Sequence, residues 1–361
     1  MIVKNITGGG TNRTPSEKKK LTMIELCSGV GMQYRGVQNT PCFEPEVVAT
    51  SEIDINAIIC YAAIHCGMTM EMIENYQYPE MERMRQYLTD LNIGYDPVKD
   101  KKYDWFKSGK KFEGQVKKVY LACKLSKNLG DVNRINSLPK ADVWFLSFPC
   151  QSISVAGKLT GIAEGSGTRS SLVWETIRLL NQAKDDDVLP QYMCLENVKN
   201  LVGKKFIDDF ERFNGIIDSF GYNVYYKVLN GKNCGVPQNR ERVFAIYIRK
   251  DIDTKQFEFP APFDTGIRLK DILEEEVDEK YYINTERAKK LIQRLLDDGV
   301  IGNDNPDSRA EQSRAEQSRA IDLSINQPRG IEYANCISAR TDRGISNRKA
   351  EGCGVCELQQ D

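Results

Sequence analysis

The chain has 361 residues and a formal net charge of −1, because 50 lysines and arginines stand against 51 aspartates and glutamates. This length can bury the core of one large or two modest domains, and this charge balance excludes nucleic-acid binding through overall charge, so any such contact needs a local basic patch. The sequence has no apolar run near the roughly 20 residues of a membrane span, no segment like a signal peptide and no regular pairing among its 11 cysteines, which indicates a reducing cytoplasm.

The N-terminal part predicts a leader, a strand and a glycine turn. Residues 1–20 are polar and rich in Gly, Thr and Lys, which predicts a disordered leader. Residues 21–26 form a short apolar run, predicted as a strand, and the turn Cys27-Ser28-Gly29-Val30-Gly31 follows before a helix. Glycines at such a turn let the backbone approach a ligand closely, although GxG alone also fits an ordinary tight turn.

A second predicted strand, residues 47–51, ends in Glu52 and Asp54. An acid at the end of the second strand can accept hydrogen bonds from both hydroxyls of a ribose. This pattern points to an adenosine-containing cofactor, with Glu52 as the ribose ligand. His65, the only histidine, falls in a predicted helix, and we interpret it as a structural or surface residue rather than a catalyst.

Residues 68–128 are predicted to be an insertion. They carry Tyr, Trp, Lys and Met at no sustained apolar period, and they include a basic cluster at residues 107–118. We expect a solvated excursion from the main domain. An element that contacts DNA through this basic cluster is the alternative.

The next strand leads to a cysteine. Residues 141–148 are apolar and predict a buried strand, which ends at Pro149-Cys150-Gln151. Open α/β sheets place their ligands at this end of a strand, and a thiolate there is a strong nucleophile. For a cysteine alone, however, a buried apolar role is more common. The glycine-rich stretch at 151–169 is predicted to be a loop that closes over the site.

Two further strand ends carry charge. Residues 193–195 predict a short strand that ends in Glu196-Asn197; a carboxylate here is often a cap, but we predict that Glu196 shares the cleft with Cys150. Residues 223–229 and 243–248 are rich in Val and Tyr and predict a strand pair. Arg240 and Arg242 precede the second of these strands, and residues two apart on a strand point the same way. Two guanidiniums on one face can clamp a phosphate or a base edge.

The character of the sequence changes after residue 251. Residues 267–296 predict a charged helix, and residues 307–321 contain the repeat SRAEQ-SRAEQ-SRA, which predicts a solvated linker or an exposed helix. The pair Cys353 and Cys356 has the CxxC spacing, but no second pair or nearby histidine completes a zinc site. We therefore expect no metal.

Five features in a fixed order carry a family resemblance. The ordered set resembles the motifs of cytosine-5 DNA methyltransferases of bacterial or phage type, over residues 21–249 and more faintly at 336–357. A dehydrogenase with a Rossmann fold would instead need a third glycine where Tyr34 stands. The features are Ile24-Glu25-Leu26-Cys27-Ser28-Gly29-Val30-Gly31, Ser51-Glu52-Ile53-Asp54, Pro149-Cys150-Gln151, Glu196-Asn197-Val198 and Gln238-Asn239-Arg240-Glu241-Arg242.

The resemblance implies an α/β, Rossmann-like S-adenosylmethionine-dependent methyltransferase fold with a small, incomplete target-recognition region. The implied activity is transfer of a methyl group from S-adenosylmethionine to carbon 5 of a cytosine flipped out of double-stranded DNA, in restriction-modification or phage protection. The implied divisions are the leader at 1–20, a catalytic and cofactor-binding domain at 21–250 that holds the insertion, and a partial target-recognition region at 251–361 with the repeat-bearing linker.

The resemblance also implies residue roles. The Cys150 thiolate attacks carbon 6 of the base, Glu196 holds ring nitrogen 3 and the exocyclic amine, and Arg240 or Arg242 holds the base carbonyl or a flanking phosphate. The residues expected at the cofactor are Cys27, Gly29, Gly31, Glu52, Ile53, Asp131, Val132, Pro149 and Leu172, with Asp131 at the adenine amino group. Those expected at the substrate are Gln151, Ser154, Arg169 and Gln238.

The sequence departs from the family pattern in two places. Cys27 stands where the family usually has an aromatic residue near the adenine. The sequence also shows neither the motif that supports the recognition region nor the closing Gly-Asn-Ser motif. We therefore expect that this chain by itself methylates DNA poorly or not at all. A truncated, impaired or split member that needs a second polypeptide is the alternative, and an RNA cytosine methyltransferase is less favoured.

Overall fold

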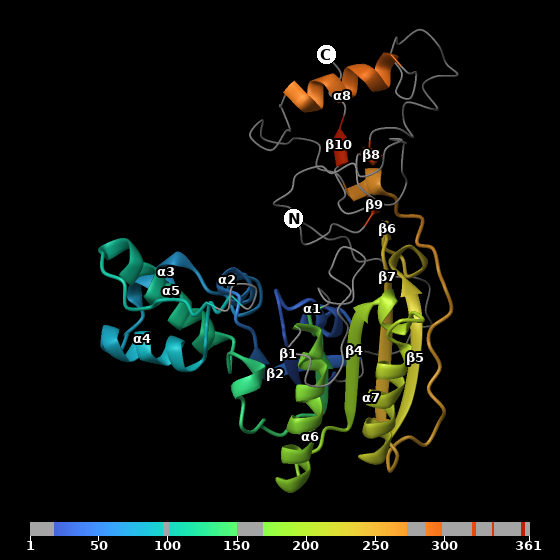
Figure 1. Cartoon of the computed structure of the whole chain (residues 1–361), viewed down its shortest axis with the longest axis horizontal. Coiled ribbons are helices and arrows are strands. Elements are labelled where there is room, and N and C mark those ends of the chain that lie inside the picture. Colours follow the sequence, from blue (N-terminus) through green and yellow to red (C-terminus); the bar gives the residue numbers. More distant parts are fainter. Residues whose placement is uncertain are drawn as a thin grey trace.

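A six-stranded sheet in the order β2-β1-β3-β4-β7-β5 forms the centre of the computed structural model (Figure 1). The neighbours among β2, β1, β3 and β4 are parallel, whereas β7 is antiparallel to both β4 and β5. This arrangement confirms the predicted α/β fold. The structure describes residues 18–96, 101–149, 169–272, 286–297, 320–322, 334–335 and 355–357. The strands of the sheet are β1 (Lys19–Leu26), β2 (Phe43–Ser51), β3 (Val143–Leu146), β4 (Tyr192–Val198), β5 (Tyr222–Asn230) and β7 (Glu241–Arg249).

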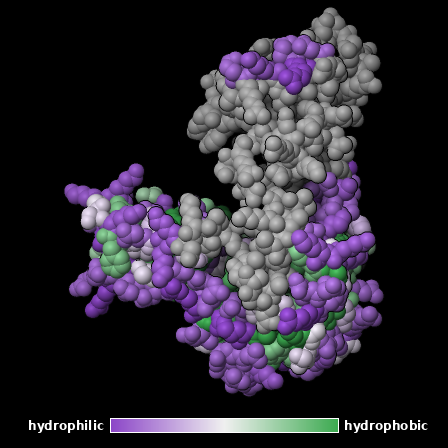
Figure 2. Space-filling view, in the orientation of Figure 1, coloured by the Kyte–Doolittle hydropathy of each residue, from purple (hydrophilic) through white to green (hydrophobic). Residues whose placement is uncertain are grey.

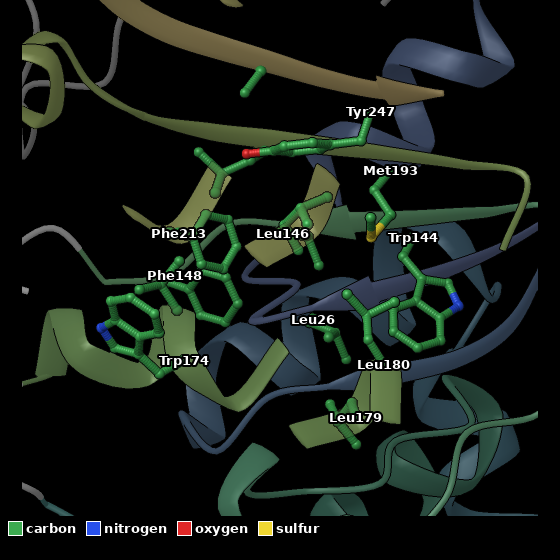
Figure 3. Close-up of a cluster of buried hydrophobic side chains, with 14 of the residues drawn as sticks. Leu26, Trp144, Leu146, Phe148, Trp174, Leu179, Leu180, Met193, Phe213 and Tyr247 are labelled. Atoms are coloured by element: carbon green, nitrogen blue, oxygen red, sulfur yellow. The ribbon is translucent and has the colours of Figure 1, made fainter. Parts of the chain in front are cut away.

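Helices cover both faces of the sheet. On one face, Leu26 and Leu146 lie opposite each other in the β1–β3 register and belong to a core that α6 and α7 complete (Figure 3). On the other face, α2 brings Tyr61 to Glu25 of β1. Because both faces are covered, β3 is one uninterrupted apolar run, as parallel central strands usually are. The covering helices are α1 (Met32–Gln38), α2 (Ile55–His65), α6 (Glu175–Asp185) and α7 (Ile207–Ser219).

Two strand boundaries differ from those predicted. β1 begins at Lys19, inside the predicted leader, because Lys19 and Lys20 continue the parallel pairing with β2; residues 1–17 lie outside the described residues. β4 continues to Val198 instead of ending at residue 195, because its last residues pair with β7. Glu196 is therefore part of a strand rather than of the turn that follows it.

The prediction of a solvated excursion at 68–128 is wrong for the described residues 68–96 and 101–128, which we call the arm. It contains three helices and a second apolar cluster of its own. The sequence shows no sustained period because α2, α4 and α5 each add only a short apolar stripe, such as Val116, Val119, Tyr120 and Cys123 on α5. The arm projects from the β2 edge of the sheet (Figure 1). Its helices are α3 (Met70–Asn75), α4 (Met81–Asp90) and α5 (Lys110–Leu125).

The described parts of the C-terminal region are short. β6 (Gln238–Asn239) pairs with β9 (Ala334–Asn335), and β8 (Ala320–Asp322) pairs with β10 (Val355–Glu357). The predicted helix at 267–296 is observed in part, as η5 (Leu269–Ile272) and α8 (Glu286–Asp297). Most of the SRAEQ repeat lies outside the described residues. The remaining short helices are η1 (Val132–Arg134), η2 (Arg169–Trp174), η3 (Lys199–Val202) and η4 (Gly231–Asn233). Of all the helices described, none has the length and apolar character needed to cross a membrane.

Candidate functional site

The turn after β1 is tight and depends on glycine. Cys27, Gly29 and Gly31 all have positive φ angles, of 56°, 54° and 80°. A side chain at Gly31 would clash, because its Cβ would lie 2.6 Å from the ring of His65. At Gly29, by contrast, a Cβ would meet nothing within 4 Å. The turn therefore presents its backbone to open space beside Gly29, as a ligand-binding turn requires.

The carboxylate of Glu52 lies against this turn. Its Oε2 accepts a hydrogen bond from the Gly29 amide at 2.9 Å, and its Oε1 accepts from the amides of Ile53 and Asp54 at 2.8 and 2.9 Å. A carboxylate has about four acceptor positions, so three amides leave capacity for a hydroxyl. Glu52 is thus fixed at the end of β2 and still able to bind a ligand.

Asn128 joins this corner to the segment that follows α5, and sequence reasoning missed it. Its side-chain oxygen accepts from the amides of Glu52 and Gly130 at 3.0 and 3.1 Å, and its amide group donates to the Glu52 carbonyl at 2.9 Å. One side chain thereby holds two chain segments 76 residues apart. The signal was its place in the run Asn128-Leu129-Gly130-Asp131, next to the residue chosen as a ligand.

Asp131 lies in the same corner and is buried. One carboxylate oxygen accepts from Asn92 of the arm at 2.7 Å, and the other accepts from the amide and side chain of Asn133. Burial raises the pKa of the Cys27 thiol, and the nearby carboxylates of Glu52 and Asp131 raise it further. The structure therefore brings the predicted cofactor residues Cys27, Gly29, Glu52 and Asp131 together, and Asn92 is a further residue that the sequence did not indicate.

The remaining predicted cofactor residues are Ile53, Val132, Pro149 and Leu172. Ile53 is half-buried, and its carbonyl accepts from the Gly94 amide of the arm at 2.7 Å. Val132 is 3% exposed and its side chain lies in the main core. Leu172 packs on the same core, and Pro149 is half-buried. The side chain of Val132 therefore packs in the core, and the cofactor roles of all four residues stay predictions.

A second cluster lies where β4 and β7 pair. The Oε1 atom of Glu196 is 3.1 Å from Nε of Arg242 and 4.0 Å from an Nη of Arg240, so both guanidiniums face one carboxylate. The expectation that these arginines point the same way is confirmed. Glu241 instead pairs with Lys199 at 3.0 Å, as expected for a residue facing away from Glu196. All three charged groups are only partly exposed, which makes their mutual interaction stronger than at an open surface.

The end of β3 is fixed beside this cluster. Asn197 donates from its side chain to the Phe148 carbonyl at 3.2 Å, and Gln33 of α1 hydrogen-bonds the hydroxyl of Ser147. The chain is thus held against β4 two residues before Cys150. The predicted residues Cys150, Gln151 and Ser154 lie outside the described residues. Arg169 begins η2, and Gln238 lies half-buried in β6, two residues before Arg240.

Glu25 is a buried acid behind the glycine turn. It is inaccessible to solvent, and it accepts from the Tyr61 hydroxyl at 2.5 Å and from the Tyr34 amide at 2.9 Å. His65 donates from Nε2 to the Val30 carbonyl at 2.9 Å, which agrees with the structural role predicted for it. Burial raises the pKa of Glu25 to about 7, and the two hydrogen bonds only partly offset this effect.

We expect Glu25 to make stability fall as pH rises. Its pKa is raised from 4.5 to about 7, so between these values the folded chain keeps a proton that the unfolded chain releases. The free energy of unfolding then decreases with rising pH across this window, by on the order of 3 kcal/mol. Glu25→Gln should flatten the difference between urea unfolding at about pH 5 and about pH 8. Glu44→Gln, an exposed position on β2, is the control; an unchanged pH dependence in Glu25→Gln would contradict the assignment.

No metal centre is evident in the part of the chain that is described, since its His, Cys, Asp and Glu side chains form no group of three or more that could hold an ion. The functional groups that the structure brings together in the two clusters are the glycine turn, the carboxylates and the arginines.

Comparison with known proteins finds a family model and several relatives that match this chain. A protein-family model with the description "C-5 cytosine-specific DNA methylase" matches residues 106–342, which include Asp131, Glu196 and both arginines. The type II methyltransferase M2.ScrFI of Lactococcus lactis subsp. cremoris is 39% identical over 274 residues, 74% of this chain and 71% of the relative. The orphan methyltransferase M.SssI of Spiroplasma monobiae is 31% identical over 278 residues, 76% and 70% respectively. The crystal structure of S. pombe Dnmt2 methyltransferase aligns with a TM-score of 0.45 at 15% identity, over 95% of this chain and 77% of that one.

Proposed function

Since the chain belongs to the C-5 cytosine-specific DNA methylase family and is a DNA (cytosine-5-)-methyltransferase, we propose that S-adenosylmethionine is its methyl donor and that the two clusters are its cofactor and cytosine sites. The observation that carries the second assignment is the Glu196 carboxylate faced by Arg240 and Arg242 beside the end of β3. A carboxylate can hold the nitrogen edge of a cytosine, and guanidiniums can hold its carbonyl or a phosphate.

The cofactor assignment rests on the fit of the first cluster. Glu52 keeps acceptor capacity for a ribose hydroxyl, the space beside Gly29 is open, and Asp131 supplies a further acceptor nearby. When bound, S-adenosylmethionine supplies a methyl group activated by its positive sulfonium. Gly29, Glu52 and Asp131 orient that cofactor at the carboxyl ends of the parallel strands.

The cytosine assignment follows the chemistry of the base. Carbon 5 of cytosine is a poor nucleophile, so we assign to the Cys150 thiolate the attack on carbon 6, which makes carbon 5 electron-rich enough to accept a methyl group. Glu196 holds ring nitrogen 3 and the exocyclic amine and so offsets the charge that develops during attack. Because this edge is paired inside a duplex, the base must leave the stack to reach the site.

We further propose that the enzyme acts in the cytoplasm on double-stranded DNA, in restriction-modification or in the protection of phage DNA. This proposal is supported by relatives named type II methyltransferases and by one named an orphan methyltransferase of Bacillus phage SPR, which is 31% identical over 260 residues. A second polypeptide that completes the target-recognition region stays a prediction.

The direct test uses the purified chain and S-adenosylmethionine with a labelled methyl group. Mixed-sequence duplex DNA and RNA are offered separately, and the products are digested and separated by chromatography. We expect 5-methylcytosine from DNA. Label on another atom, or on RNA alone, would contradict the proposal. If label appears only after a second chain from the same source is added, the split-enzyme alternative is supported.

Glu52→Ala should weaken cofactor binding by about 10- to 100-fold. The substitution removes a charged acceptor, and hydrogen bonds to charged groups contribute about 1.5–3 kcal/mol each. Isothermal calorimetry with S-adenosylmethionine measures the change, and Glu46→Ala, an exposed acid on β2, should bind like the parent. An affinity that is the same for Glu52→Ala as for the parent would exclude the ribose role.

A further inference from the structure

The arm concentrates positive charge in a chain that is otherwise acidic. Residues 101–127 hold nine lysines and two acids, a formal charge of +7, although the whole chain carries −1. The rest of the chain is therefore strongly negative and would repel a polyanion. Because this enzyme acts on DNA, one surface has to attract phosphates locally. Residues 101–127 are the most basic segment of the described chain, whereas residues 68–96 of the arm hold six acids and two arginines. The nine are Lys101, Lys102, Lys107, Lys110, Lys111, Lys117, Lys118, Lys124 and Lys127.

The lysines of α5 are arranged in rows. Lys110, Lys117 and Lys124 are seven residues apart, which is nearly two helical turns, so they share one side of the helix at intervals of about 10 Å. Lys111 and Lys118 repeat the same spacing beside them. All of these side chains are exposed except Lys118, which is half-buried. The helix thus displays a strip of charge along its length.

Aromatic rings hold some of these ammonium groups in place. Lys117 lies 5.3 Å from the ring centroid of Tyr78, and Lys124 lies 4.0 Å from that of Tyr87 and 5.4 Å from that of Tyr120. The Tyr87 and Tyr120 rings contact each other edge to face. Such cation–π contacts orient the charge without neutralising it.

Acidic side chains do not neutralise this strip. Within the ranges that the structure describes, none of the nine lysines forms an ion pair with an Asp or Glu. The charge therefore remains available to an incoming anion. The hydrophilic surface of the arm is visible in Figure 2.

The arm is anchored at the edge of the sheet that carries the proposed sites. Its end leads into Asn128, which holds Glu52, and the Asp131 amide donates to the Leu91 carbonyl of the arm at 3.0 Å. A duplex that presents a cytosine to Glu196 must continue past the site on both sides, so its flanking phosphates extend beyond the strand that carries Glu196. The spacing of the lysines suits such an extended, repeating row of charges.

From these observations we propose that the lysine strip of α5 binds the phosphate backbone of duplex DNA that flanks the target cytosine. The inference rests on the proposed function and extends it to a second DNA-contact surface. It assigns a role to the arm that is independent of base recognition, because phosphate contacts position a protein on DNA and carry no sequence information.

The test replaces four strip lysines in the full chain, as K110Q/K111Q/K117Q/K118Q, and leaves Lys124 on its tyrosines. Affinity for a mixed-sequence 40-base-pair duplex is measured by fluorescence anisotropy over a range of salt concentrations. Each lost phosphate contact lowers the slope of log affinity against log salt by about 0.9. We therefore expect the slope to fall by about 3–4 and the affinity at moderate salt to fall at least about tenfold.

Two control variants make the test specific. K140Q/K184Q/K227Q/K255Q removes the same charge from exposed positions outside the arm and should leave the slope near that of the parent. Replacement of the four strip lysines by arginine keeps the charge and should also keep the slope, which separates lost charge from lost folding.

Three outcomes would overturn the proposal. The first two are an unchanged salt slope in the strip variant and an equal loss of slope in the matched control. The third is a strip variant that still binds DNA but no longer binds poly-glutamate, measured as a second ligand, which would indicate an acidic protein partner. Calorimetric affinity for S-adenosylmethionine should be the same in all variants. Because binding is measured without methyl transfer, failure of the strip and failure of the proposed activity give different results.

Discussion

Replacement of Cys150 by serine is expected to abolish methyl transfer, with a loss of at least about a thousandfold in rate. A serine hydroxyl stays protonated near neutral pH, whereas a thiol is readily converted to the thiolate that attacks carbon 6. The rate is measured as transfer of labelled methyl groups to DNA. A duplex containing 5-fluorocytosine within the recognition site gives a second readout, because the fluorine blocks release of the covalent adduct and leaves a complex that survives a denaturing gel.

Cys42 and Cys60 provide the matched controls, because both are free and exposed in the structure. Cys42→Ser and Cys60→Ser should methylate DNA and trap it as the parent does. If Cys150→Ser formed the covalent complex as efficiently as the parent, another residue would be the nucleophile and the assignment would be wrong.

Replacement of Glu196 by glutamine is expected to lower the rate of methyl transfer by about 100- to 1000-fold, a typical cost of removing one preorganised group that stabilises developing charge. The amide keeps the shape of the side chain but loses the negative charge that offsets protonation of ring nitrogen 3. Because the carboxylate is partly exposed and paired with Arg242 and Arg240, its loss should change the free energy of unfolding only slightly. Single-turnover methylation separates this step from binding, and cofactor affinity should stay unchanged.

Glu241→Gln is the control for this prediction. Glu241 is next to Arg242 in sequence but pairs with Lys199 on the other side of the strand, so it should not touch the base. We expect Glu241→Gln to keep nearly full activity. Equal losses in the two variants would mean that the charge of the region, rather than a contact of Glu196 with cytosine, controls the rate.

Local sequence patterns were sufficient to predict those strands whose buried residues follow a regular pattern within the strand itself. The apolar runs before Cys27 and Pro149 predicted β1 and β3, and the Val- and Tyr-rich residues 223–229 and 243–248 predicted the strand pair β5 and β7. The structure confirms these strands and shows that β5 and β7 are antiparallel. Alternation also predicted that Arg240 and Arg242 face the same way. This last conclusion depends only on the two-residue period of a strand.

Patterns failed where the apolar surface is shared among elements. The arm had no recognisable period because its core is assembled from short stripes on α2, α4 and α5, and the two members from α2, Ile58 and Ala62, lie before the arm begins. The end of β4 was also predicted too early, because the apolar run in the sequence stops before Glu196. In the structure, Asn197 and Val198 continue the strand because they gain backbone partners on β7. Tertiary pairing overrides local propensity at such positions.

By itself, therefore, the sequence determined the α/β class, the order of the strand ends and, through the family resemblance, the chemistry that those ends support. Tertiary structure alone decided how those ends meet: that Asn128 joins Glu52 to the Asp131 segment, that Asn92 of the arm supports Asp131, and that one carboxylate faces both arginines. The physical reason is that hydrogen bonds and ion pairs between distant segments form only after the apolar faces have packed. A local period records which side of an element is buried and carries no information about its polar partners.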